Sequence, residues 1–133
     1  MKEFTTGQMF KCPTHAALIN HLFDMDIKGW QKAGYSYGGD KLCWFLSLTW
    51  SIKEGWRNIF TDKSKEILQE EYTRGSLPQA VTNLGYNESI RAVFRIVDDG
   101  YRKYIFEGMY QRVDEMGRDN KRFYKKISDS FMA

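Results

Sequence analysis

The sequence predicts a single α+β domain, residues 1–133, built mostly from an antiparallel sheet. An apolar stripe at helical spacing near the N-terminus is followed by several short runs in which apolar and polar side chains alternate. Turns rich in glycine and aspartate separate these runs. The 133-residue length and the apolar content of 42% suit one domain with one core. We expect about five to six strands, with barrel-like closure as one option, an N-terminal helix and a short inserted helix.

Both helices are expected from their capping residues. Thr14 follows Pro13 and can cap the first turn of an N-terminal helix, whose apolar stripe runs from Ala17 to Phe23. The inserted helix is expected between Ser76 as its cap and Gly85 as its stop.

Three strands are expected in the first half of the chain. The clearest is 41–50, where Leu42, Trp44 and the next alternate residues form one strongly apolar face. The preceding segment 30–37 ends in Gly38-Gly39-Asp40, a composition typical of a turn between paired strands. Residues 55–62 form the third strand and close in a polar turn.

Segment 65–73 fits either a helix or an edge strand, and the short strands around it favour the strand. Farther on, Asp98-Asp99-Gly100 separates two runs rich in β-branched and aromatic residues, which predicts a hairpin. With a last strand at 121–127, the C-terminal third is a three-strand meander. A helix-turn-helix over 77–97 is the alternative, but residues 88–97 mix the two periods and end like a hairpin.

No arrangement of residues suggests catalysis, a metal site or a cofactor. His15 and His21 are six residues apart and cannot form a metal pair on one helix face. Cys12 and Cys43 have neither the spacing of a zinc site nor the density of a disulfide framework, so we expect free buried thiols. Because no apolar stretch has the length of a signal peptide or a membrane span, a cytoplasmic protein is expected. The lack of a catalytic arrangement predicts that the protein is not an enzyme.

Aromatic and basic residues on the predicted strands indicate a nucleic-acid partner, although most of the rings could simply fill the core. Exposed rings can stack on bases while Lys and Arg neutralise phosphates. This hypothesis requires the rings and cations of the meander to share one side of the sheet. The candidate phosphate contacts are Arg57, Lys103, Arg112, Arg118, Lys121, Arg122 and Lys125, and the candidate stacking residues are Trp30, Tyr35, Trp56 and Tyr110.

Several short motifs carry a resemblance to a known class of module. They are Gly29-Trp-Gln-Lys32, Gly55-Trp-Arg-Asn58 with the later segment 67–70, and Phe106-Glu-Gly-Met-Tyr110. Together with the segment 121–127, they resemble a small β-rich module found alone or beside nuclease and helicase domains in bacterial restriction-type proteins. The resemblance covers about two thirds of the chain and implies a part that recognises DNA or senses its modification without the nuclease. The predicted helix within 77–87 departs from that pattern, so no catalytic role is carried over.

Two functions from different classes follow. The first is a non-enzymatic module that binds DNA or senses DNA modification in a restriction or defence context. The alternative is a small phage or mobile-element protein that binds and inhibits a host defence protein, motivated by the compact size and the aromatic content. An enzyme with scattered site residues ranks last.

Overall fold

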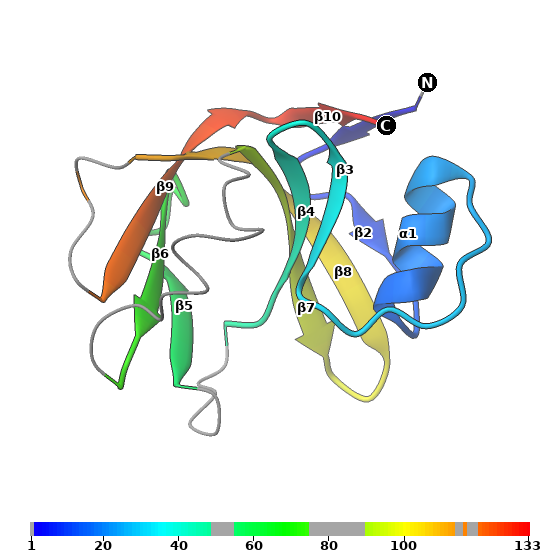
Figure 1. The fold of residues 1–133 in the computed structure, drawn as a ribbon, viewed down its shortest axis with the longest axis horizontal. Helices are drawn as coiled ribbons and strands as arrows, with labels where there is room; N and C mark the ends of the chain where they lie inside the picture. The colour runs from blue at the N-terminus through cyan, green and yellow to red at the C-terminus, as the bar shows by residue number, and fades with distance from the viewer. Residues whose placement is uncertain (1, 49–54, 75–89, 114–115, 117–119) are drawn as a thin grey trace.

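The structure is a computed structural model that describes residues 2–48, 55–74, 90–113, 116 and 120–133 (Figure 1). These residues form one helix, α1 (His15–Phe23), and ten strands, more than the five to six expected. The expected helix between Ser76 and Gly85 lies outside the described residues. The strands are β1 (Glu3–Thr5), β2 (Met9–Phe10), β3 (Gly34–Gly38), β4 (Lys41–Leu46), β5 (Trp56–Phe60), β6 (Ile67–Tyr72), β7 (Ile90–Asp98), β8 (Arg102–Arg112), β9 (Lys121–Ser128) and β10 (Ser130–Met132).

Helix α1 begins and ends as its sequence predicts. The Thr14 Oγ1 atom accepts a hydrogen bond from the Ala17 N–H at 3.1 Å, which confirms the expected cap. Asp24 ends the helix in the left-handed conformation, with φ of 53°. Leu18, Ile19 and Leu22 are buried against the sheet. In the part of the chain that is described, no helix is both long and apolar enough to cross a membrane.

The main sheet has the strand order β3-β4-β7-β8-β9-β6-β5, and β2 pairs with β8 beside this path. All described pairs are antiparallel except β4 with β7, so the expected antiparallel character is confirmed. The predicted hairpin and meander are confirmed as β7, β8 and β9. Segment 65–73 is a strand, as favoured, but β6 lies between β5 and β9 and not at an edge. Barrel-like closure is not found, because the described order ends at β3 and β5.

One face of the sheet, called here the outer face, is covered by α1 and by the two-stranded ribbon of β1 and β10. Its core joins helix residues such as Leu22 to Phe45, Phe94 and Phe106 of the sheet, with Phe131 from the ribbon. Rings meet at close range there, and the Phe94 and Phe106 centroids lie 5.2 Å apart. Most of the aromatic side chains of the described residues therefore pack in this layer.

The opposite face, called the inner face, is concave. The Trp44 ring of β4 and the Tyr124 ring of β9 have centroids 5.1 Å apart although β7 and β8 lie between their strands. In a flat sheet, three strand spacings would separate them by about 14 Å. Phe60 of β5 and Tyr110 of β8, also three strands apart, meet at 6.1 Å. The sheet therefore curls around these side chains, as the arch in Figure 1 shows.

Strand β4 is buried on both faces. The expectation of a single apolar face for 41–50 is therefore wrong. Trp44 and Leu46 belong to the inner cluster, whereas Cys43 and Phe45 belong to the outer core. The reason is the layer formed by α1, which covers the second face of β4. The strand ends at Leu46, and Trp50 lies outside the described residues.

A β-bulge interrupts the pairing of β7 and β8. Val93 pairs with Gly108 and Phe94 with Phe106, so Glu107 is the extra residue. Gly108 has φ of 137°, and a Cβ atom there would lie 2.8 Å from Lys126 Cε and 3.1 Å from the Ser128 carbonyl oxygen. Both the conformation and the space at this position require glycine.

Replacement Gly108→Ala should therefore lower the free energy of unfolding by about 1–3 kcal/mol, measured by urea denaturation. Gly7→Ala is the matched control, because Gly7 also has a positive φ, of 92°, but nothing lies within 4 Å of the added Cβ. The difference between the two variants reports the crowding at the bulge. A Gly108→Ala protein as stable as the wild type would contradict this account.

Candidate functional site

A group of polar residues lies on the inner face of the three neighbouring strands β5, β6 and β9. Asn58 of β5 is paired in register with Glu70 of β6, and Glu70 is paired with Arg122 of β9. Only 8% of Glu70 and 7% of Arg122 is exposed. The Tyr124 hydroxyl donates a hydrogen bond to Glu70 Oε1 at 3.0 Å. The Glu70 carboxylate is thus buried on the inner face, where the Tyr124 hydroxyl fixes its orientation.

An arginine and two rings extend this group toward β4. The guanidinium carbon of Arg91 lies 4.5 Å from the Trp44 ring centroid and 4.8 Å from that of Tyr124. Arg91 is 1% exposed, so its charge is held between π faces away from water. Burial, reinforced by the negative charge of Glu70, raises the pKa of Tyr124. The hydroxyl therefore stays protonated and remains a donor at neutral pH.

Asn58 supplies the most informative atom of the cluster. Its Oδ1 is shielded from solvent and has no hydrogen-bond partner among the described residues. Buried polar atoms are nearly always hydrogen-bonded, because leaving one unpaired costs about 1–3 kcal/mol. Trp56 lies two positions away on the same face, half-buried, with its ring 5.0 Å from that of Tyr72. The arrangement offers an unused acceptor, a carboxylate and an aromatic surface together.

A second set of contacts connects the β5–β6 turn to β7 and β8 in the middle of the curved sheet. The buried carboxylate of Glu107, at the bulge of β8, lies 3.0 Å from Lys65 Nζ and 3.4 Å from Arg95 Nε. The Tyr110 hydroxyl donates to the Lys65 carbonyl oxygen at 2.6 Å. Lys65, in the turn between β5 and β6, has a left-handed φ of 58°. These contacts, called here the brace, tie that turn to β8 across the concavity.

The structure disperses the predicted stacking rings. Trp30 and Tyr35 pack on each other, with centroids 5.2 Å apart, against the outer core. Tyr110 is 0% exposed within the inner cluster, because its ring fills the curve of the sheet. Trp56 alone of the four predicted rings is both partly exposed and close to the polar group at Asn58.

The predicted cations do not share one side of the sheet, which corrects the expectation. Strand alternation sends Arg112 and Arg122 to the inner face, and Arg57, Lys121 and Lys125 to the outer face of β5, β6 and β9. Arg57 and Lys121 each lie 3.8 Å from a Glu71 carboxylate oxygen, and Lys125 is exposed. Lys103 lies at the start of β8, beside the hairpin turn, and pairs with Asp99. Arg118 lies outside the described residues.

Asn58, Glu70 and Arg91 were not predicted as site residues. A signal for them exists in the strand periods, because Asn58 lies between Trp56 and Phe60, and Glu70 between Leu68 and Tyr72, at alternate positions. A polar residue at an inward-facing position of an apolar strand face indicates a buried polar contact. The number of charged residues in a segment does not reveal this pattern, because only their alternate positions show which side chains face inward.

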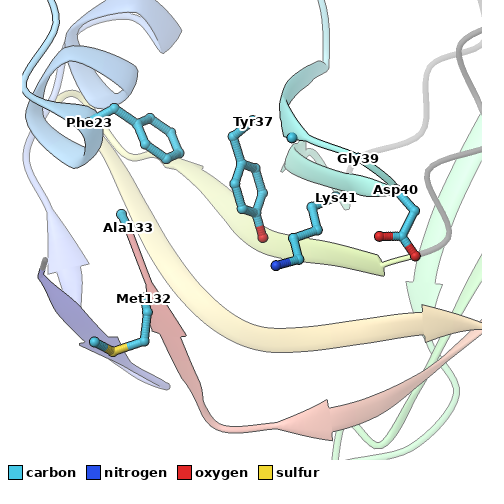
Figure 2. A pocket seen from close by; sticks show the side chains of 8 residues that line it. Phe23, Tyr37, Gly39, Asp40, Lys41, Met132 and Ala133 are labelled. Carbon is cyan, nitrogen blue, oxygen red and sulfur yellow. The ribbon is translucent and has the colours of Figure 1, made fainter.

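A shallow hollow of ≈ 410 Å³ opens on the opposite side of the molecule, beside α1 and the chain ends (Figure 2). Phe23, Tyr37 and Met132 supply its apolar walls, and Asp40 and Lys41 lie at its rim. None of the inner-cluster residues lines it. Within the described residues, no group of three or more potential metal ligands is found.

The brace predicts a specific loss of stability. Glu107→Gln removes the negative charge that Lys65 and Arg95 share and should lower the free energy of unfolding by about 1–3 kcal/mol, measured by urea denaturation followed by tryptophan fluorescence. Glu66→Gln, an exposed carboxylate in the same turn as Lys65, is the control and should change little. Equal stability of the two variants would show that the brace contributes nothing.

Comparison with known proteins was consistent with the predicted resemblance to restriction-type modules. No curated protein matches the chain. Among solved structures, the 5-hydroxymethylcytosine-specific restriction enzyme AbaSI is similar, with a TM-score of 0.74 at 19% sequence identity. The alignment covers 98% of this chain and 42% of that one, so this chain spans less than half of AbaSI and shares its fold there. The model of the SET and RING associated domain, SRA, matches residues 2–133. The chain belongs to the SRA domain family.

Proposed function

We propose that this chain is a DNA-binding module that senses base modification in a restriction-type context and is not itself an enzyme. Membership of the SRA family and a fold shared with part of a 5-hydroxymethylcytosine-specific restriction enzyme support this proposal. The absence of a catalytic arrangement in the sequence supports the non-enzymatic part. The observation that carries the proposal within the structure is the unpartnered Asn58 Oδ1 beside the buried Glu70.

The polar group of the inner face suits the hydrogen-bonding edge of a base. A glutamate carboxylate accepts from the exocyclic amino group of cytosine, and an asparagine amide offers both a donor and an acceptor. Because Glu70 is only 8% exposed, a base must leave its stack to reach it. Trp56, half-buried on the same face, supplies a surface on which such a base can stack.

Phosphate contacts in this proposal come from cations near the open ends of β5, β6 and β9. Arg57 and Lys121 flank the Glu71 carboxylate at the strand ends that carry Trp56 and Tyr72, and the exposed Lys125 lies farther along β9, where it pairs with Ile67 of β6. Such contacts hold the duplex in place without reading its sequence. Binding should therefore weaken steeply as salt increases.

The test is fluorescence anisotropy at about 50 mM salt with labelled duplexes that carry cytosine, 5-methylcytosine or 5-hydroxymethylcytosine at one site. We expect binding to all three and tighter binding to at least one modified duplex. The pure chain, incubated with the same duplexes and Mg²⁺, should leave them intact. Absence of binding to every duplex refutes the proposed function, and cleavage refutes the non-enzymatic part.

Asn58 Oδ1 is an acceptor that can take a hydrogen bond from the hydroxyl group of 5-hydroxymethylcytosine, a donor that cytosine lacks. The variant Asn58→Ala should therefore reduce the discrimination between 5-hydroxymethylated and unmodified duplexes by about 5- to 100-fold, since a good base contact contributes about 1–3 kcal/mol. Gln69→Ala is the matched control, because Gln69 is the neighbour of Glu70 on β6 and points to the outer face. If both variants discriminate as the wild type does, Asn58 does not read the base.

A further inference from the structure

We propose that Tyr101, at the tip of the β7–β8 hairpin, is a second DNA contact that binds through its ring and not through charge. The inference rests on the proposed DNA-binding function and adds a contact outside the polar group at Asn58 and Glu70. Its ligand is the apolar surface of a DNA groove, made of deoxyribose and base faces.

Tyr101 has an exposure that the core cannot explain. Its exposed fraction is 62%, the highest among the exposed large hydrophobic residues of the described chain. It follows Gly100, whose φ of 97° turns the chain at the end of two long strands of 9 and 11 residues. A large aromatic ring is thus held in solvent at the turn. The hairpin of β7 and β8 projects from the sheet (Figure 1).

The charges around the ring are already compensated. Arg102 lies 3.4 Å from Asp98, and Lys103 lies 3.1 Å from Asp99, so the tip carries two cations and two carboxylates in pairs. The first pair connects the two strands, and the second connects the turn to β8. Because the tip has no charge excess, attraction to phosphates cannot be its main contribution, and the ring is the group that it presents.

Between the tip and the inner cluster, apolar side chains lie beside the basic side chains of Arg95 and Lys103 on the same face. Ile105 pairs with Arg95, and Val97 pairs with Lys103, which places Ile105 and Val97 on the inner face. Met9 of β2 pairs with Ile105 on that face and is 48% exposed. These partly exposed apolar residues continue the inner face beyond the region that the curled sheet encloses.

The position of the hairpin favours DNA as the occupant. In Figure 1 the hairpin tip and the ends of β5 and β6 that carry Trp56 and Tyr72 project on the same side of the molecule, with the inner face between them. A duplex whose base enters the inner face would therefore lie against the tip as well. Apolar and aromatic side chains commonly contact DNA in this way, by packing on sugars or inserting beside base steps.

The test is the affinity of Tyr101→Ala for the best-bound duplex over a series of salt concentrations. Loss of a stacked ring should weaken binding by about 5- to 100-fold at every salt concentration. The slope of log affinity against log salt should stay that of the wild type, because no phosphate contact is removed. Lys125→Gln is the comparison variant and should reduce the slope by about 1. Tyr101→Phe, which keeps the ring, should retain most of the affinity.

Met132→Ala is the surface control, because Met132 is 50% exposed but lies on β10 at the chain ends. If Tyr101→Ala binds as tightly as this control while Asn58→Ala loses discrimination, the inference is wrong and the proposed function stands. A reduced salt slope in Tyr101→Ala also overturns it, since the contact would then act through charge. If the wild type binds no duplex, the proposed function fails first, and the inference with it.

Discussion

Curvature of the sheet is the constraint on which the rest of this structure depends. Trp44 and Tyr124 can touch only because the strands between their own strands bend, and Phe60 reaches Tyr110 for the same reason. The bulge at Glu107 supplies a local bend, since an extra residue in one strand increases twist and tilts the strand. Without this curl, the residues of the inner face would lie on an open surface with no core of their own.

The two faces of the sheet are buried in different ways. The outer face is a conventional apolar layer, in which α1 and the β1–β10 ribbon cover the sheet with leucines and phenylalanines. The inner face has no covering helix among the described residues and is enclosed by its own curvature. Buried polar and charged side chains, Glu70, Arg91, Glu107 and Arg122, are placed where a purely apolar filling would be cheaper in free energy. Glu107 belongs to the brace, whereas Glu70 and Arg91 are held in place by Tyr124 and Trp44.

Local patterns predicted the local elements. Alternation and turn residues identified β4 to β9 within a few positions, and the cap at Thr14 identified α1. Strands β1, β2 and β10 have two or three residues each, too few for any period to be visible, and they form only because distant partners pair with them. The separation of Lys121 and Lys125 from Arg122 follows from alternation alone, so it was predictable. The contact between the Trp44 ring of β4 and the Tyr124 ring of β9 was not predictable, because curvature arises from contacts between residues far apart in the sequence.

Pairing of β1 with β10 brings the two ends of the described chain together, with the Lys2 amide and the Ala133 carbonyl oxygen 2.9 Å apart. A polypeptide inserted between these ends, or a linker joining them, would need to span only a very short distance. The module could therefore be circularly permuted or placed inside a host protein as a cassette, with entry and exit at one point. In Figure 1 that point lies on the side of the sheet away from the hairpin tip, so a fused neighbour would leave the concave face accessible.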